Sequence, residues 1–252
     1  MKIENLSFSY ENEPVIKNIS FSIRRKAVTT LIGANACGKT TLLKLMTKNL
    51  QPDSGAVFLD NIHLECIKIK DFAKKAAIVH QKNTAPDDLT VKSVVTYGRL
   101  PHATAFQRNS KHDEERILWA MEATGISDLH DKVMGELSGG QRQRAFIAMA
   151  LAQDTEFLFL DEPTTFLDIR YQVEILRLIQ KLNRDFGLTI VMVLHDINQA
   201  LMYSDEVIGM KSGEILVQGS PSDVISKETI HNLYGIDLKI QKTDEGLWVM
   251  PT

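Results

Sequence analysis

The sequence has few of the features that mark secreted, membrane-spanning or nucleic-acid-binding chains. It holds only two cysteines, Cys37 and Cys66, which form neither a CxxC pair nor a metal-ligand pattern and so suit a reducing cytosol. The first residues alternate polar and apolar side chains and lack the apolar segment of a signal peptide. No apolar run approaches the ~20 residues that a membrane helix needs. We therefore expect a chain that does not itself cross a membrane.

The sequence also lacks a large excess of positive or negative charge. The 29 Lys and Arg residues nearly balance the 32 Asp and Glu residues, for a net charge of −3. Proteins that bind duplex nucleic acid usually carry a basic excess or stripe, so this balance argues against nucleic acid as the main partner. With 252 residues, of which 44% are hydrophobic, the chain can bury one sizeable core, with or without an attached lobe.

Short apolar or alternating segments predict strands in the first part of the chain and again after residue 155. They lie at 7–10, 19–23, 28–33, 56–60, 76–80, 156–162 and 188–196, with a further pair at 206–219 that turns at 211–213. A predicted helix over 169–187 separates two of the buried strands. Strand, helix and strand in alternation are typical of a parallel α/β sheet.

Helices are predicted between these two groups of strands. Thr90 is placed to cap a helix over 91–99, and a second helix over 112–125 has acidic residues in its first turn. We expect one domain over 1–252, in which 1–81 and 156–220 form a catalytic core and 82–155 form an inserted helical subdomain. A short helical tail is expected after Pro221, within 221–252.

The stretch GANACGKT at 33–40 matches the phosphate-binding P-loop pattern, with a predicted strand before it and a helix after it. Gly33 and Gly38 allow the backbone to curl so that successive N–H groups converge on phosphate oxygens. Lys39 is placed to reach the β- and γ-phosphates, and the Thr40 hydroxyl is a ligand for Mg²⁺. We expect Cys37 to contribute its backbone N–H rather than a reactive thiol.

Acidic residues end the buried strand FLFLDE. Asp161 and Glu162 stand at the strand tip, where ligands bind in open α/β sheets. Beside a P-loop, this pair favours an outer Mg²⁺ ligand at Asp161 and a water-orienting group at Glu162 over a simple helix cap. His195, at the tip of another predicted strand, is a candidate contact for the γ-phosphate.

A second glycine-rich stretch, LSGGQ, occupies 137–141. Ser138 is placed to cap the helix that follows, which accounts for the serine but not for the two glycines. A helix N-terminus preceded by glycines is also an anion site. The residues alone leave open which phosphate such a site serves.

Taken in order, these motifs resemble the ATP-binding cassette (ABC) ATPases that drive membrane transporters, over nearly the whole chain. The resemblance implies an α/β fold: a P-loop NTPase (RecA-like) core with an N-terminal antiparallel β-subdomain and an inserted α-helical subdomain that carries LSGGQ. It also implies two cofactors, ATP and Mg²⁺. The motifs are Tyr10 as adenine-stacking aromatic, the Walker A loop 33–41, Gln81 as the glutamine loop, the signature 137–141, the Walker B strand 157–162, Asp168 in the D-loop and His195 as the switch histidine.

The resemblance assigns a role to each of these positions. The nucleotide-binding set is Tyr10, Gly33, Ala34, Asn35, Ala36, Cys37, Gly38, Lys39, Thr40 and Thr41. The catalytic set is Glu162, His195 and Gln81, and the Mg²⁺ set is Thr40, Gln81 and, through water, Asp161. Two copies are expected to pack head to tail, so that the signature residues of one copy close over the ATP of the other. These are Ser138, Gly139, Gly140 and Gln141, with the D-loop Asp168 beside them.

Three positions depart from the common family pattern. Ala34 stands where many cassettes have proline, and Ala36 where many have glycine. Both contribute mainly backbone, so alanine fits them if the local φ is negative. Phe166 is larger than the usual alanine of the D-loop, and its size bears on dimer packing.

Two stretches resemble importers of ferric siderophores, haem and cobalamin. They are YGRLPH at 97–102 and PTTFLDI at 163–169. The resemblance implies an ATPase at the cytoplasmic face of the cell membrane that drives import of an iron complex. Its partners are a polytopic permease and, indirectly, an extracytoplasmic substrate-binding protein. The alternatives are a cobalamin importer ATPase and a cytosolic ATPase of iron–sulfur assembly. Repair cassettes have a coiled-coil insertion and translation cassettes have two copies in one chain, and this sequence has neither.

Overall fold

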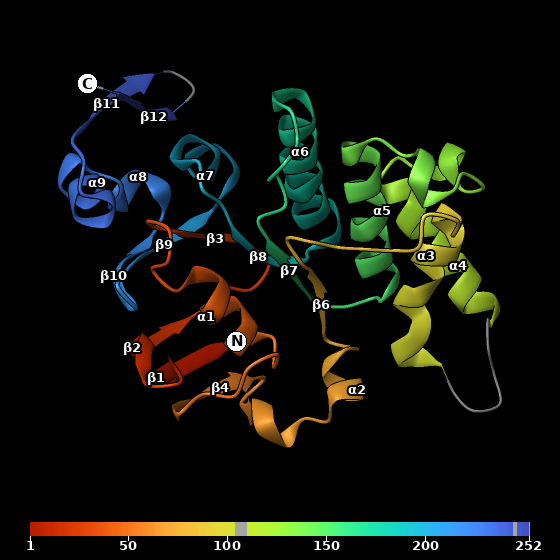
Figure 1. The fold of residues 1–252 in the computed structure, drawn as a ribbon, viewed down its shortest axis with the longest axis horizontal. Helices are drawn as coiled ribbons and strands as arrows, with labels where there is room; N and C mark the ends of the chain where they lie inside the picture. The colour runs from red at the N-terminus through yellow and green to blue at the C-terminus, as the bar shows by residue number, and fades with distance from the viewer. Residues whose placement is uncertain (104–109, 244–245, 252) are drawn as a thin grey trace. The chain divides into compact units, whose positions relative to one another are not determined.

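The computed structural model describes residues 1–103, 110–243 and 246–251 (Figure 1). The chain divides into two compact units. Unit 1 comprises Met1–Ile67 with Thr189–Thr252, and unit 2 comprises Lys68–Leu188. Unit 1 therefore contains the P-loop and His195, whereas unit 2 contains Gln81, the signature and the Walker B strand.

Unit 1 begins with a four-stranded antiparallel sheet, as the family resemblance implies. Its order is β2-β1-β4-β5, from β1 (Lys2–Tyr10), β2 (Glu13–Ser22), β4 (Ser54–Leu59) and β5 (Ile62–His63). The buried residues of β1 and β2 are apolar and lie two or three positions apart, among them Leu6 and Ile19, and the pairing register of the two strands shifts along their length. This pattern is expected of an antiparallel sheet with one solvated face.

The second sheet of unit 1 positions the P-loop. Its strands run in the order β10-β9-β3-β8, from β3 (Val28–Ile32), β8 (Thr189–Val193), β9 (Glu206–Lys211) and β10 (Glu214–Gly219). β3 is parallel to both β8 and β9, and all five residues of β3 and of β8 are buried. Helix α1 (Lys39–Met46) follows β3, and α7 (Ile197–Tyr203) follows β8. The P-loop and the turn that carries His195 therefore both lie at the carboxyl ends of parallel strands.

The C-terminal tail contains more than the expected helix. Helices α8 (Pro221–Val224) and α9 (Lys227–Tyr234) agree with the sequence-based expectation, but β11 (Leu238–Thr243) and β12 (Gly246–Pro251) then form an antiparallel hairpin. This hairpin was not predicted from the sequence. The alternation of apolar and polar residues at 238–242 was the available signal for a strand.

Unit 2 combines a parallel strand pair with a group of helices. β6 (Ala76–Val79) pairs with β7 (Phe157–Asp161), and the long helix α6 (Ile169–Phe186) comes after β7. Helix α5 (Gly139–Ala152) packs against α3 (Val91–Thr96) and α4 (Lys111–Ala123), as Figure 1 shows. Shorter elements are α2 (Ile69–Phe72) and the 3₁₀ turns η2 (Tyr97–His102), η3 (Ser127–Leu129) and η4 (Met134–Glu136), while η1 (Leu64–Cys66) belongs to unit 1. Residues 104–109 of the predicted helical subdomain lie outside the described residues.

The predicted caps of two of these helices are confirmed. Thr90 accepts a hydrogen bond from the backbone N–H of Ser93 at the start of α3. Ser138 accepts one from the N–H of Gln141 at the start of α5. Both side chains satisfy an N–H group that has no partner inside its helix.

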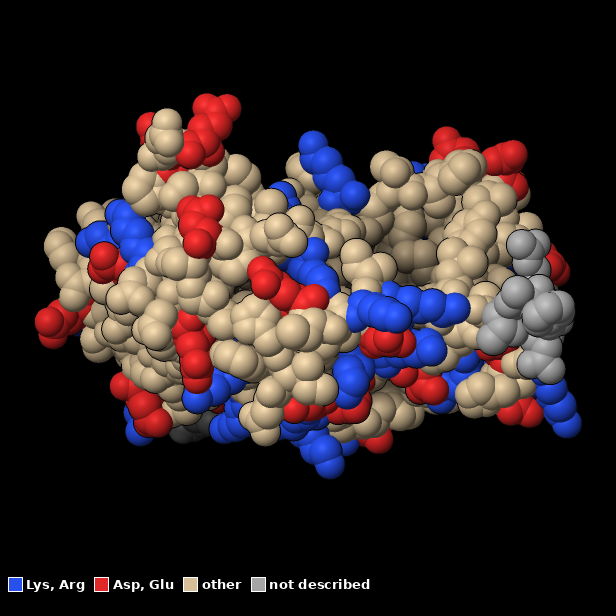
Figure 2. Space-filling model, turned by 90° about the horizontal axis from the view of Figure 1, so that it is seen from below, with Lys and Arg blue, Asp and Glu red and all other residues tan. Residues whose placement is uncertain are grey.

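Surface charge and helix composition are relevant to nucleic-acid binding and to membrane spanning. On the face of the described residues that Figure 2 shows, Lys and Arg side chains are interspersed with Asp and Glu. Among the described helices, none combines the length and apolar character that a membrane span requires.

Candidate functional site

The P-loop of unit 1 connects the end of β3 to the start of α1. Gly33 has φ 142° and Gly38 has φ 107°, values in the region that favours glycine. A Cβ on Gly33 would lie 2.2 Å from the carbonyl oxygen of Met210, and one on Gly38 would lie 2.9 Å from Cδ1 of Ile16. The two glycines are therefore required both by backbone conformation and by the closeness of neighbouring strands.

Lys39 lies along this loop. Its Nζ donates hydrogen bonds to the carbonyl oxygens of Gly33, at 2.8 Å, and Ala34, at 2.9 Å, and the residue is only 5% exposed. The loop is tied to the next hairpin as well, because the N–H of Gly213 donates to the carbonyl of Cys37 at 3.1 Å. A buried ammonium group within the loop provides positive charge where a polyphosphate chain fits.

The N-terminus of α1 adds to this positive potential. Its N-cap is Gly38, which has no side chain with which to cap the first turn. Backbone N–H groups at such an end form an anion site, and the helix dipole strengthens it. A curled loop, a buried ammonium and a helix start without a side-chain cap together fit the phosphates of a nucleotide.

Ala36 does not meet the condition under which alanine suits its position. Its φ is 61°, in the left-handed region. A Cβ in this region clashes with the backbone, at a cost of roughly 1–2 kcal/mol. This alanine holds a conformation that glycine would adopt without strain.

Two further candidates of unit 1 stand at element ends. Tyr10, at the end of β1, is 44% exposed and makes an edge-to-face contact with Phe8 at 4.8 Å between ring centroids. His195 is exposed and follows β8, and the next residue, Asp196, caps α7 by accepting from the N–H of Gln199. Tyr10 is thus exposed, as a residue that stacks on a ligand must be.

In unit 2, the tip of β7 brings Glu162 together with Gln81. Nε2 of Gln81 donates to Oε2 of Glu162 at 2.5 Å, and the Thr165 hydroxyl donates to the same oxygen at 3.0 Å. Glu162 has φ 52°, a left-handed conformation that is unusual for its residue type. Asp161, the residue before it, is 5% exposed. The two donors hold the Glu162 carboxylate in one orientation.

The signature residues open helix α5 with a reciprocal capping box. Gln141 Oε1 accepts from the N–H of Ser138 at 3.0 Å, while Ser138 Oγ accepts from the N–H of Gln141 at 3.3 Å. The two glycines between them differ in surroundings. Gly139 is exposed, whereas a Cβ on buried Gly140 would lie 2.4 Å from the ring of Tyr171. Gly140 is needed for packing against α6, and Gly139 keeps the helix start open.

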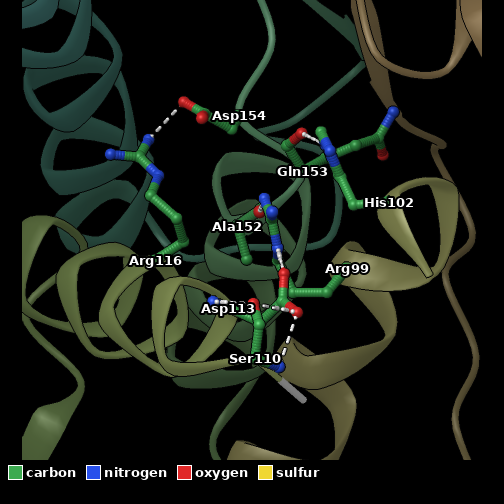
Figure 3. Close-up of polar contacts among 8 residues, drawn as sticks. All are labelled: Arg99, His102, Ser110, Asp113, Arg116, Ala152, Gln153 and Asp154. Carbon is green, nitrogen blue, oxygen red and sulfur yellow. Dashed lines mark hydrogen bonds and ion pairs between the residues drawn. The ribbon is translucent and has the colours of Figure 1, made fainter. Parts of the chain in front are cut away.

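The opposite end of α5 explains the YGRLPH stretch (Figure 3). Arg99 donates through Nη1 to the carbonyl of Ala152 and through Nε to Asp113, both at 2.7 Å. His102 contacts the carbonyl of Gln153 at 2.8 Å. Side-chain contacts of this kind satisfy the last carbonyls of a helix, and the charge of Arg99 also interacts favourably with the helix dipole. Arg99 is 5% exposed, so this motif has a structural role in addition to any role in a partner interface.

Asp113 completes this cluster. It forms a capping box with Ser110 at the start of α4. Burial alone raises the pKa of the Asp113 carboxyl, but hydrogen bonds from Arg99 and Ser110 outweigh that effect and lower the pKa below its ordinary value. The carboxylate therefore stays charged opposite Arg99.

The D-loop leads into α6. Asp168 is the N-cap of α6 and accepts from the N–H of Tyr171 at 3.0 Å. Two apolar side chains beside it face outward: Phe166 is 82% exposed with φ 66°, and Ile169 is 80% exposed. Asp168 thus has a local structural role, as the cap of α6.

The structure brings some predicted residues together and adds others. Residues 33–41 form one loop and the first turn of α1 in unit 1, and Gln81 bonds to Glu162 in unit 2. Sequence reasoning missed Thr165, which holds Glu162, and Tyr171, which packs on Gly140. It also missed Tyr234, whose hydroxyl accepts from the N–H of Gly33 at 3.1 Å. Of these three residues, only Thr165 could have been identified from the sequence, because it lies three residues after Glu162.

Comparison with protein families finds a match over residues 16–165 to the model described as ABC transporter. Among curated proteins, the chain is 43% identical over 233 residues to the ferric enterobactin transport ATP-binding protein FepC of Escherichia coli (strain K12). That alignment covers 92% of this chain and 86% of FepC. The chain is also 42% identical over 240 residues to the iron(3+)-hydroxamate import ATP-binding protein FhuC of Bacillus subtilis (strain 168). This second alignment covers 95% of the chain and 89% of FhuC.

Solved structures share the fold. A metal-chelate type ABC transporter in an inward-facing conformation superposes with a TM-score of 0.84 at 25% identity, over 98% of this chain and 94% of that one. The dimeric, post-hydrolysis structure of the ATP-binding cassette MJ0796 bound to ADP and Pi gives a TM-score of 0.75 at 28% identity. It covers 87% of this chain and 98% of that cassette.

Proposed function

This chain belongs to the ABC transporter family, and from that premise we propose that it is the ATP-hydrolysing subunit that powers import of an iron complex through a membrane permease. The observation that carries the ATPase assignment is the P-loop, with Lys39 buried along it and α1 starting at its end. The iron-complex assignment rests on relatives named for ferric enterobactin and iron(3+)-hydroxamate transport, at 43% and 42% identity.

We propose that the P-loop residues 33–41 bind the phosphates of ATP and that Tyr10 stacks on the adenine. Lys39 exchanges its hydrogen bonds to the Gly33 and Ala34 carbonyls for bonds to phosphate oxygens, which are stronger because both partners are charged. Mg²⁺, when bound, neutralises phosphate charge, and its proposed ligands are Thr40, Gln81 and, through water, Asp161.

Glu162 is the proposed group that orients or deprotonates the attacking water. Its carboxylate is held by Gln81 and Thr165, and a fixed acceptor is what water positioning requires. Because Gln81 donates directly to Glu162, a movement of the glutamine loop changes the orientation of the carboxylate. His195 is the proposed contact for the γ-phosphate.

The signature is proposed to serve the ATP bound by a second copy of the chain. Ser138, Gly139, Gly140 and Gln141 are supported in that role by the capped but exposed start of α5. Phe166 and Ile169, apolar and more than three-quarters exposed, suit a surface that a second copy covers. We place Asp168 at the same interface.

The proposed membrane partner is a polytopic permease, which receives substrate from an extracytoplasmic binding protein. A cytoplasmic helix of this permease is proposed to dock on residues 82–104, where Tyr97 is 48% and Leu100 64% exposed. The ATPase is then peripheral, at the cytoplasmic face of the membrane, and nucleic acid is not a partner. Crosslinks from the permease that consistently reach 221–252 in place of 82–104 would contradict this docking site.

The direct test of function is transport by cells that carry Glu162→Gln. We expect this variant to bind ATP, to lose turnover by 10²- to 10⁴-fold, and to abolish uptake of labelled ferric siderophore. Glu115→Gln, which makes the same chemical change at an exposed residue of α4, is the matched control and should transport normally.

The transported cargo is identified by which uptake activity the Glu162→Gln cells lose. Loss of cobalamin uptake with iron uptake intact would indicate a cobalamin importer. Normal uptake of both, without co-purification of a permease, would indicate the iron–sulfur assembly ATPase. Wild-type ATP hydrolysis by Glu162→Gln would remove Glu162 from its proposed role.

A further inference from the structure

The peptide group of Gly33, at the base of the P-loop, is held from the far end of the chain. Its N–H donates to the hydroxyl of Tyr234 at 3.1 Å, across 201 positions in sequence. Its carbonyl accepts from Lys39 Nζ at 2.8 Å. A Cβ at Gly33 would contact the Met210 carbonyl, so β9 closes the remaining side. The hydroxyl of Tyr234 is therefore a fixed part of the loop's support.

Helix α9 delivers this hydroxyl by packing on β9. Ile230 and Leu233 of α9 are buried, and a Cβ on Gly209 would lie only 3.0 Å from Cδ1 of Leu233. Gly209 pairs with Ile32, the residue before Gly33. The helix ends directly after Tyr234, at Gly235 with φ 71°. A packed and terminated helix leaves Tyr234 little freedom of position.

The same tail is attached next to His195. Asn198 lies in the first turn of α7, three residues after His195. Its Nδ2 donates to the carbonyl of Val249 at 3.0 Å, and its Oδ1 accepts from the N–H of Val249 at 2.8 Å. Val249 belongs to β12 and is 6% exposed. The amide side chain thus pairs with β12 as a neighbouring strand would.

We propose that the C-terminal brace, defined as α9 with the β11–β12 hairpin, positions the two nucleotide-facing segments of unit 1. Tyr234 is the positioning residue for the P-loop, and Asn198 is the positioning residue for the turn that carries His195. The proposal deepens the function given above and rests on its ATP site.

The two attachments have different expected effects. The P-loop binds the phosphates in every state of the cycle, so loosening Gly33 weakens nucleotide binding. His195 is proposed to act at the γ-phosphate, so loosening α7 lowers turnover and leaves nucleotide binding nearly unchanged. A brace with a purely structural role would lower thermal stability and change neither quantity selectively.

The test compares Tyr234→Phe with Asn198→Ala in the purified full chain. We expect Tyr234→Phe to raise Kd for Mg·AMP-PNP by about 5- to 10-fold, the loss expected for one buried hydrogen bond, with kcat at saturating ATP within about twofold. Asn198→Ala is expected to lower kcat by about tenfold and to change Kd by less than about twofold.

One control matches the chemistry of the asparagine change. Asn183→Ala removes a side-chain amide that donates to the Leu188 carbonyl in unit 2, and it should keep the wild-type Kd and kcat. If Tyr234→Phe folds with the wild-type Kd, or if both variants lower kcat and raise Kd in parallel, the positioning roles are wrong and the ATPase assignment stands. A wild-type chain that fails to bind Mg·AMP-PNP would overturn both.

Discussion

At the scale of single residues, the backbone conformation of the P-loop decides whether a side chain is strained. Gly33 and Gly38 have positive φ and close neighbours, and Ala36 between them has φ 61°. Alanine at this position is strained in the folded state, since left-handed φ brings its Cβ against the backbone. The strain lies inside the loop that is proposed to bind phosphate.

Relief of this strain is the first prediction. Ala36→Gly removes roughly 1–2 kcal/mol of strain but adds about 0.4–1 kcal/mol of chain entropy to the unfolded state. We expect a net change of roughly 0 to 1.6 kcal/mol in favour of the folded state, in the free energy of unfolding measured by urea titration. Ala34→Gly is the control: Ala34 is not among the described residues with positive φ, so glycine there should only destabilise. A loss of stability in both variants would contradict the argument.

Tyr234 gives a prediction about alkaline pH. Burial raises its pKa to about 12 from the ordinary value of 10.0, and the Gly33 N–H opposes that shift only in part. In the unfolded chain the phenol ionises near its ordinary pKa, whereas in the folded chain it stays neutral. The stabilisation is therefore complete below pH 10 and is lost as pH rises from 10 to 12.

The measurement compares wild type with Tyr234→Phe, because other groups also titrate in this range. We expect the difference in unfolding free energy between the two chains to change by at most about 2–3 kcal/mol across the interval, in the direction that disfavours wild type. A difference that is constant with pH would show that Tyr234 ionises equally in both states.

At the scale of elements, helix α5 is held at both ends. Ser138 and Gln141 cap its start, and Arg99 and His102 satisfy carbonyls at its end. A helix of 14 residues spans about 21 Å. The signature and the YGRLPH stretch therefore lie at opposite ends of one helix.

The two signature glycines give the third prediction. Gly140→Ala places a methyl group 2.4 Å from the Tyr171 ring, an overpacking that typically costs 1–3 kcal/mol, so the free energy of unfolding should fall by about that much. At Gly139 the nearest atom, in Leu167, is 3.3 Å away, and alanine should be nearly neutral for stability. Equal losses of stability, measured by thermal unfolding, would refute the packing role of Gly140.

At the scale of the whole molecule, the proposed unit of function is two chains. The signature of one copy is proposed to complete the site formed by the P-loop of the other. Mixing Lys39→Ala chains with Ser138→Arg chains should then yield some dimers that have one intact composite site and one doubly damaged site. Trapping of labelled nucleotide after mixing measures this recovery.

Each variant on its own is the control for that experiment, since a dimer of one variant has no intact site. Recovery only in the mixture supports action in trans. If the signature served the P-loop of its own chain, every chain in the mixture would carry a damaged site, and no recovery would occur.

Sequence patterns identified those features whose physics is local. The spacing of Gly33, Gly38 and Lys39, and the caps at Thr90 and Ser138, depend on neighbouring residues, and the structure places them as expected. The hairpin after residue 237 was missed because two short strands give a weak signal beside a helix. The sequence left the sign of φ at Ala36 open, because residue type alone does not fix a backbone conformation.

The order of the motifs along the sequence was sufficient to determine the family, and with it the P-loop and the expected use of ATP. Only the tertiary structure decided which residues support the motifs. Tyr234 reaches Gly33 across 201 positions, Tyr171 packs on Gly140 and Arg99 bonds to Ala152. These pairs depend on how buried helices and strands pack, and no periodicity or spacing in the sequence encodes such contacts, because each partner satisfies its own local rules without the other.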